Sequence, residues 1–184
     1  MNEHVLVIGG TGMLRDTTLW LLEKGYHVSV IGRTSMKHQQ LQKQTLHKEK
    51  LHSIKLDYYN TPLLLQEIKK VIQQYGPISI VVCWIRSDAI SSLKVICNII
   101  QQTTDKQWKL YHIQSSTKFF KKETILVPDN CLYRSIFLGF ILENNQSRWL
   151  THDEISNGVI ECIKNDPPES IVGTVTPWEK RPSY

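Results

Sequence analysis

The sequence predicts an α/β domain in which a doubly wound parallel sheet lies between two layers of helices. Three observations support this fold class. Apolar segments of strand length alternate with longer segments of helical periodicity over residues 1–116. Residues 78–83 are continuously apolar except for Ser79, as a parallel strand covered on both faces requires. A glycine-rich turn, Gly9-Gly10-Thr11-Gly12, joins the first strand to the first helix.

The elements of this region are bounded by recognisable signals. The first helix ends at Gly25, and the third begins with Pro62 behind Thr61 as its cap. Ser35 is the expected cap of the second helix. The expected strands cover residues 5–8, 27–31, 51–56, 78–83 and 108–114, and the expected helices cover residues 12–24, 36–47, 62–75 and 89–102.

The alternation changes after the fifth strand. Residues 132–142 form a long β-like segment that we expect to extend the sheet. Thr151-His152-Asp153-Glu154 has the form of a capping box, which predicts a helix from there to about residue 164. Residues 171–175 have the pattern of a last short strand. We therefore expect one three-layer domain over 1–184, with a core over 1–116 and a C-terminal strand, helix and tail over 117–184.

Composition excludes several classes of protein. No segment approaches the roughly 20 apolar residues of a membrane span, and the first strand begins too early for a signal peptide to precede it. The four cysteines are widely spaced, and the seven histidines form no HxxxH pair. We therefore expect reduced thiols in a cytoplasmic protein, and no metal site.

The charge of the chain is a second constraint on its partners. The net charge is +5, and lysines between residues 37 and 55 form a basic stretch. Glutamines are interspersed among these lysines and no aromatic residue accompanies them, so we expect a solvated helix face and no nucleic-acid partner. A basic surface also favours an anionic cofactor.

The glycine turn is the strongest functional signal in the chain. A buried strand, a glycine turn and a helix in this order open a dinucleotide-binding βαβ unit of the Rossmann type. Glycine lets the backbone come close to a pyrophosphate, and N–H groups at the helix N-terminus attract its charge. The alternative is an ordinary tight turn without a ligand. The residues expected to contact the cofactor here are Gly9, Gly10, Thr11, Gly12, Met13 and Leu14.

Arg15 occupies the position at which the usual motif has its third glycine. That glycine normally lets the helix pack closely on the strand. The Arg15 side chain must therefore point outward, or the helix must sit slightly differently. The same departure supports a third hypothesis, in which the fold has lost its ligand.

The end of the second strand decides between the two nicotinamide cofactors. An NAD-preferring site usually has Asp or Glu there, whereas this chain has Gly32-Arg33-Thr34. A guanidinium matches the charge and the fork geometry of a 2′-phosphate. We therefore expect Arg33 and Thr34, assisted by Lys37, to favour NADP(H) over NAD(H). The alternative for Arg33 is a solvated loop residue.

Further candidate contacts follow the third and fourth strands. Asp57 is either an acceptor for the adenine amino group or a turn residue. Trp84 and Ile85 follow the fourth strand, and the carboxyl ends of parallel strands line the cofactor crevice. We therefore expect both residues near the adenine-ribose half of the cofactor, although Trp84 is equally compatible with the core.

These residues resemble the short-chain dehydrogenase/reductase superfamily, and most closely its atypical, NmrA-like members, whose glycine motif is GxxGxxG. Residues 5–12 and Arg33 carry the resemblance, which covers residues 4–116. The whole chain is also similar to small bacterial proteins of short-chain dehydrogenase type. The resemblance implies a Rossmann fold and an NAD(P) cofactor.

Typical members of that superfamily carry a catalytic serine and a Tyr-x-x-x-Lys pair. The tyrosine passes a proton to or from the substrate oxygen, and the lysine lowers the pKa of that tyrosine. No tyrosine of this chain has a lysine four residues later. Ser115 and Ser116 lie where the family serine is found, and are otherwise loop serines. Tyr133 is the remaining candidate for a general acid, although it falls within an expected strand.

Two functions from different classes follow from these residues. The first is an NADP(H)-dependent oxidoreductase of atypical type, and the second is a non-catalytic NADP(H)-binding redox sensor or regulatory protein. The absent Tyr-Lys pair favours the second. Roughly 70 residues follow the fifth strand, which leaves little chain for a substrate pocket, so a second copy could complete one. The candidate interface aromatics, for which burial within one chain is the favoured alternative, are Phe119, Phe120, Trp149 and Trp178.

Overall fold

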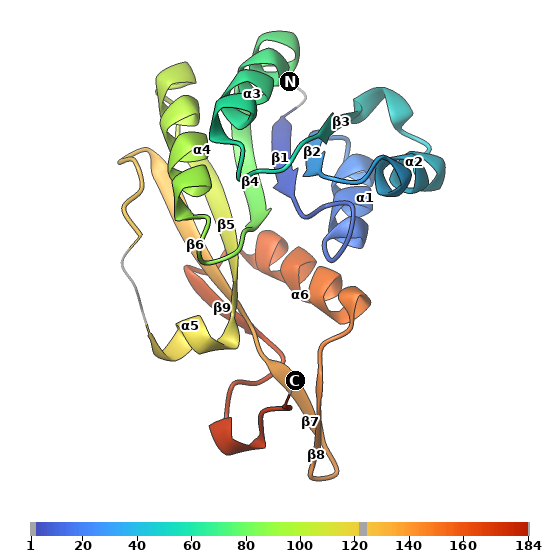
Figure 1. The fold of residues 1–184 in the computed structure, drawn as a ribbon, viewed down its shortest axis with the longest axis vertical. Coiled ribbons are helices and arrows are strands. Elements are labelled where there is room, and N and C mark those ends of the chain that lie inside the picture. Colours follow the sequence, from blue (N-terminus) through green and yellow to red (C-terminus); the bar gives the residue numbers. More distant parts are fainter. Residues whose placement is uncertain (1–2, 122–124, 184) are drawn as a thin grey trace.

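The centre of the protein is a seven-stranded parallel sheet in the order β3-β2-β1-β4-β5-β6-β9 (Figure 1). The computed structural model describes residues 3–121 and 125–183. The order reverses between β1 and β4, so the switch point of the sheet lies beside the glycine turn. The strands of the sheet are β1 (His4–Ile8), β2 (His27–Gly32), β3 (Leu51–Lys55), β4 (Ile78–Trp84), β5 (Trp108–Ser115), β6 (Cys131–Leu138) and β9 (Glu169–Val172).

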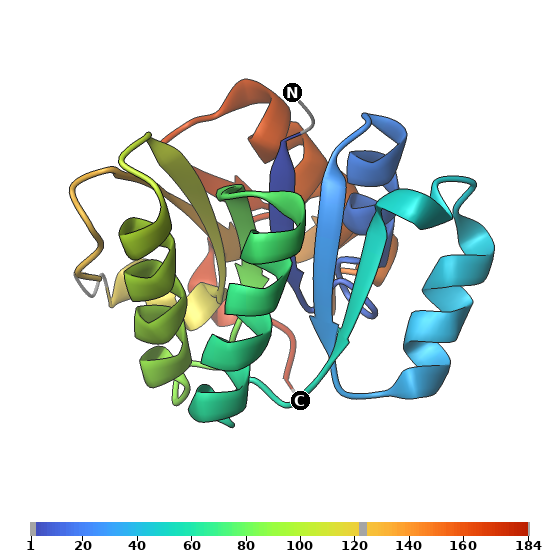
Figure 2. The ribbon, with the colours of Figure 1, turned by 90° about the horizontal axis from the view of Figure 1, so that it is seen from above.

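Helices cover both faces of the sheet (Figure 2). One face carries α1 (Arg15–Glu23), α2 (Ser35–Gln44) and α6 (His152–Asn165), and the other carries α3 (Thr61–Tyr75) and α4 (Ile90–Thr103). Strand β1 shows why both layers are needed. Its residues Leu6 and Ile8 are buried against α3 and α4, whereas Val5 and Val7 are buried against α1 and α6. The predicted Rossmann-type fold, with one three-layer domain, is confirmed.

The C-terminal segment contains more structure than the sequence pattern predicts. The long strand expected over 132–142 is two strands, β6 and β7 (Phe140–Glu143), and β7 pairs antiparallel with β8 (Gln146–Trp149). Gly139 lies between β6 and β7. Only glycine fits there, because a Cβ would lie 2.0 Å from the carbonyl oxygen of Thr174. The last strand begins earlier than expected, as β9. The pattern also predicts neither the β7–β8 hairpin nor three short helices, α5 (Ser116–Phe120), η1 (Lys48–Lys50) and η2 (Trp178–Lys180).

Two of the predicted helix caps are wrong. Thr34 is the N-cap residue of α2 in place of Ser35. Asn60 caps α3 in place of Thr61, and the Asn60 side-chain oxygen accepts a hydrogen bond from the Leu63 N–H at 3.2 Å. Asparagine caps a helix at least as well as threonine, and Pro62 fits the second position of the helix without losing a helical hydrogen bond.

The capping box of α6 is present as the sequence predicts. The Thr151 hydroxyl accepts a hydrogen bond from the Glu154 N–H at 3.2 Å, and the Glu154 carboxylate accepts one from the Thr151 N–H at 2.8 Å. The Arg148 guanidinium donates two hydrogen bonds of 2.8 Å to the same carboxylate. These hydrogen bonds, with that from Arg148 foremost, lower the pKa of Glu154 to about 2.

Thr151→Ala is expected to lower the free energy of unfolding by about 1 kcal/mol, because an N-terminal N–H of α6 loses its acceptor. Urea denaturation at neutral pH measures the change. Thr151→Ser keeps the hydroxyl and is expected to stay close to wild type. A serine variant as unstable as the alanine variant would show that the methyl group of Thr151, and not its hydroxyl, stabilises the helix.

Neither a membrane-spanning helix nor a metal-binding cluster is found among residues 3–121 and 125–183. None of the helices there combines the length and apolar character needed to cross a membrane. No group of three or more His, Cys, Asp or Glu side chains in these ranges is placed to hold a metal ion. The four cysteine thiols, Cys83, Cys97, Cys131 and Cys162, are free and buried.

Candidate functional site

The glycine turn joins β1 to α1 at the carboxyl edge of the sheet (Figure 1). Gly9 has a φ of +91°, which glycine adopts without strain. The Gly9 carbonyl accepts hydrogen bonds from the N–H groups of Gly12 and Leu14, at 3.1 and 3.2 Å. The N–H groups of Thr11 and Met13 have no acceptor in the described part of the chain. They are donors available to an anion at the start of α1.

Gly10 and Gly12 differ in the space around them. A Cβ at Gly10 would lie 2.5 Å from the hydroxyl oxygen of Thr18 and 2.8 Å from a methyl group of Val7. Gly10 is therefore the point at which α1 packs closely on the sheet. A Cβ at Gly12 would meet nothing closer than the Gly9 carbonyl oxygen at 3.9 Å. The space beside Gly12 is open, as the approach of a phosphate requires.

The Arg15 side chain points outward, which is one of the two arrangements that the sequence allows. Its Nε donates to the Asp16 carboxylate at 2.9 Å, its Nη2 lies 4.0 Å from the Asp153 carboxylate, and 43% of the side chain is exposed. Gly10, and not residue 15, provides the close contact between helix and sheet. Arginine at the third glycine position therefore leaves the turn intact.

The residues expected to select NADP(H) lie beside this turn. Gly32 ends β2, and a Cβ there would lie 2.6 Å from the hydroxyl oxygen of Thr11. Arg33 is largely exposed, and its Nη1 lies 3.9 Å from one carboxylate oxygen of Asp57. The other oxygen of Asp57 accepts a hydrogen bond from the Tyr59 N–H at 3.1 Å, as in an Asx turn. The structure thus brings Arg33 and Asp57 together, with Asp57 serving the turn.

A basic groove opens between the glycine turn, α2 and the start of α6. Arg15, Lys37 and Lys43 are three cationic side chains on its walls, and none of its lining residues is acidic. Lys37 and Gly12 thus line the same groove. The remaining lining residues are Thr11, Gly12, Gln40, Gln44 and His152. The groove suits an anionic group next to the turn.

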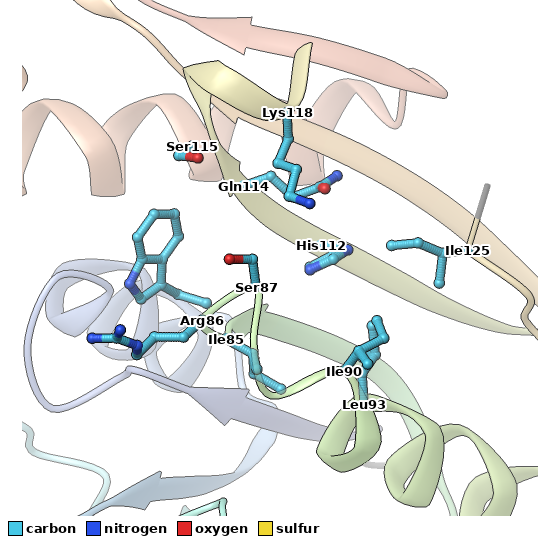
Figure 3. A pocket seen from close by; sticks show the side chains of 11 residues that line it. Ile85, Arg86, Ser87, Ile90, Leu93, His112, Gln114, Ser115, Lys118 and Ile125 are labelled. Carbon is cyan, nitrogen blue, oxygen red and sulfur yellow. The ribbon is translucent and has the colours of Figure 1, made fainter. Parts of the chain in front are cut away.

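A chamber of about 390 Å³ lies at the carboxyl ends of β4 and β5 (Figure 3). Its two sides differ in character, and Trp84, Arg86, Ser87 and Ile125 complete the lining. The apolar side consists of Ile85, Ile90 and Leu93, and the polar side consists of His112, Gln114, Ser115 and Lys118.

Trp84 connects the chamber to the glycine turn. Its side chain lines the chamber, and its Cβ lies 3.4 Å from the position that a Cβ of Gly9 would occupy. Ile85 and Ser115 line the same chamber, so three of the candidate residues, from the ends of β4 and β5, meet there. Ser116, by contrast, is buried.

Tyr133 lies in β6, behind the polar side of the chamber. Its hydroxyl oxygen is 2.8 Å from Nδ1 of His112 and 3.3 Å from Nε2 of Gln114. Burial raises the pKa of Tyr133 to about 12. Burial, and secondly the charge of Lys118, lower the pKa of His112 to about 4. Both side chains are therefore neutral at pH 7.

Comparison with known proteins is informative only at the level of structure. No family model matches the chain, and no curated protein matches it in sequence. A SCOR enzyme from Clostridium thermocellum superposes with a TM-score of 0.69 at 17% identity, over 100% of this chain and 96% of that one. A short-chain dehydrogenase/reductase from Brucella melitensis gives 0.68 at 9% identity, over 92% and 94%. One from Serratia marcescens gives 0.67 at 12% identity, over 93% and 97%.

The chain has the short-chain dehydrogenase/reductase fold. Within this fold, the described part of the connection from β5 to β6 contains only the five-residue helix α5. The chamber therefore lies beside β5, on the same face of the sheet that α3 and α4 cover. The sequence reasoning missed His112 and Gln114. The signal that could have found them is the alternation of Leu110, His112 and Gln114, which puts two polar side chains on one face at the carboxyl end of a strand.

The four aromatic residues considered for an interface all contact side chains of the same chain. Phe119 packs edge-on against Phe137, with ring centroids 5.4 Å apart. Phe120 and Trp178 are on the surface and pack against each other, 4.9 Å between centroids. The Trp149 ring lies 5.9 Å from the Arg181 guanidinium. Contacts within one chain thus account for much of this group.

Proposed function

We propose that the protein is an NADP(H)-dependent oxidoreductase built on this fold without a Tyr-x-x-x-Lys pair. The observation that carries the proposal is the adjacency of the glycine turn and the chamber, which meet at Trp84. In an open parallel sheet the ligand binds along the carboxyl edge at the switch point, where both features lie. The cofactor, when bound, supplies or accepts the hydride.

Chain residues fit the parts of such a cofactor in order along this edge. The free N–H groups of Thr11 and Met13 and the open space beside Gly12 suit the pyrophosphate. Trp84 and Ile85 are expected near the adenine-ribose half of the cofactor. Because they line the chamber, they would also lie along its nicotinamide half. A non-catalytic sensor needs no such chamber, so this feature favours an enzyme over the redox-sensor hypothesis.

The preference for NADP(H) rests on positive charge around the end of β2. Arg33 is exposed there and held near Asp57, and Lys37 reaches the groove beside Gly12. A 2′-phosphate carries negative charge that these cations attract, whereas the ribose hydroxyl of NAD(H) gains nothing from them. Thr34 ends the same loop as the N-cap residue of α2.

Arg33→Ala is expected to weaken NADPH binding about tenfold, because a charge-assisted contact to a phosphate is lost, and to change NADH binding by less than about twofold. Titration of each cofactor, followed by quenching of tryptophan fluorescence, measures both constants. Lys69→Ala removes an exposed cation from α3 and serves as the matched control. An equal loss for the two cofactors would contradict the assignment of Arg33 to the 2′-phosphate.

Turnover separates the enzyme from the sensor. NADPH oxidation is expected with at least one member of a panel of aldehydes, ketones and quinones. Tight NADPH binding without oxidation across the panel would favour the sensor, and absence of binding to any nucleotide would favour a fold that has lost its ligand.

A further inference from the structure

We propose that the His112 imidazole, held by Tyr133, is the hydrogen-bond and proton donor to the carbonyl oxygen of a neutral, mainly apolar ketone or aldehyde bound in the chamber. The role of proton donor rests on the proposed oxidoreductase function, whereas the ligand-binding part does not. Neither side chain belongs to the Tyr-x-x-x-Lys arrangement, since the Tyr133 hydroxyl contacts a histidine on the neighbouring strand.

The hydrogen bonds around Tyr133 determine which nitrogen of His112 carries the proton. The Gln114 amide donates to the Tyr133 hydroxyl oxygen at 3.3 Å, and the Ser135 side chain forms a second hydrogen bond with it. With both groups as donors, the hydroxyl hydrogen points to the acceptor 2.8 Å away, His112 Nδ1. Because the imidazole is neutral at pH 7, its single proton is then on Nε2. His112 lines the chamber, and Nε2 has no hydrogen-bond partner among the described residues. The chamber is thus offered an oriented N–H donor.

The walls define the ligand that this donor would hold. Ile85, Ile90 and Leu93 line the side opposite His112, so the body of the ligand is apolar (Figure 3). A neutral N–H donor that faces an apolar wall selects an acceptor oxygen, because a ligand without one leaves Nε2 desolvated and unpaired. The adjoining glycine turn places this oxygen next to the proposed cofactor site. An aromatic or alicyclic carbonyl compound combines these properties.

The same geometry supplies the proton that carbonyl reduction requires. A bound reduced cofactor would supply a hydride with its electron pair to the carbonyl carbon, the C=O π bond would break, and the oxygen would need one proton. His112 gives the oxygen its Nε2 proton while Nδ1 takes the hydroxyl proton of Tyr133, so the imidazole remains neutral throughout. Tyr133 then regains a proton from solvent. Tyr133 is a positioning residue here, and His112 is the group that touches the substrate.

Nitrogen-15 NMR of histidine-labelled protein tests the protonation state without cofactor or substrate. The expected spectrum at pH 7 shows His112 neutral with its proton on Nε2. In Tyr133→Phe we expect a mixture of the two neutral tautomers, with the proton on Nδ1 or on Nε2. Assignment uses His112→Leu. A proton found on Nδ1 in the wild type, or a tautomer unchanged in Tyr133→Phe, would overturn the proposed orientation.

Binding of acetophenone labelled with carbon-13 at its carbonyl tests the ligand, again without cofactor. A downfield shift of the carbonyl signal is expected on the wild type, and His112→Leu should weaken binding about fivefold and remove the shift. His112→Gln, which keeps an N–H donor, should restore part of both, and His47→Leu is the matched control. Identical binding and shift in His112→Leu would refute the ligand assignment. Since NADPH is absent, a failure of NADPH binding in the separate titration leaves this result interpretable.

Discussion

Gly12→Ala is expected to weaken NADPH binding by at least tenfold while the fold remains as stable as wild type. The added methyl group would enter the open space beside the turn, where nothing lies within 3.9 Å. A bound pyrophosphate needs the same space, because glycine motifs work by letting backbone N–H groups reach the phosphate oxygens. Replacing glycine with alanine also reduces the entropy of the unfolded chain, so stability should not fall.

Gly10→Ala is the control that gives the opposite result. Its methyl group would overlap the Thr18 hydroxyl and Val7, so the free energy of unfolding should fall by about 1–3 kcal/mol. Urea denaturation and NADPH titration, applied to both variants, separate packing from binding. Wild-type NADPH affinity in Gly12→Ala would show that the phosphates do not approach the turn. It would favour the hypothesis that the glycine turn has lost its ligand.

Local signals in the sequence account for most of the fold. The continuous apolar strands and the glycine and proline stops identify the parallel sheet, because burial and backbone geometry act within a few residues. The capping box at Thr151 located the start of α6 for the same reason. The break between β6 and β7 was not predictable, because it depends on Gly139 meeting the backbone of Thr174, a contact between segments distant in the chain.

The candidate site also contains parts that short sequence motifs predict and parts that depend on contacts between distant segments. The glycine turn and Arg33 belong to short motifs, and the sequence alone nominates them. The sequence could not show whether Arg15 disturbs the packing of α1 on the sheet, because that packing depends on the contact between Gly10 and the side chain of Thr18. The pairing of His112 with Tyr133 depends on the register of β5 and β6, in which Ser135 lies opposite His112 and Tyr133 lies opposite Leu110. No local pattern encodes that register.

Lowering the pH from 7 to 5 is expected to reduce the free energy of unfolding by about 2 kcal/mol through His112 alone. Burial, with a smaller effect of Lys118, lowers the pKa of His112 to about 4 in the folded protein, against 6.5 for an unperturbed histidine. Between these two values the unfolded chain binds a proton that the folded chain does not. Stability is therefore complete above about pH 6.5, falls as the pH decreases, and stops falling through this group below about pH 4.

Two further histidines act in the same direction. Burial lowers the pKa of His4, which bonds to Ser29 and Gly76, and burial lowers the pKa of His52 to about 4. His52 is only half-buried, so its contribution is smaller. Asp166 acts in the same direction at lower pH: the Arg134 guanidinium holds the pKa of its carboxyl well below the usual range, so its contribution is lost as the pH falls below about 5. The lowered pKa of Glu154 acts in the same low range, so the window from pH 6.5 to about 5 reports on the histidines.

Urea midpoints measured from pH 7.5 to 4.5 test this account. His112→Leu is expected to flatten the decline by the 2 kcal/mol assigned to His112 at pH 5, because the leucine has no proton to bind in either state. An undiminished slope in His112→Leu would mean that the pKa of His112 is the same in the folded and the unfolded chain, which would contradict its burial as a neutral imidazole. The stability curve and the ligand experiment therefore depend on one physical quantity, the proton occupancy of His112.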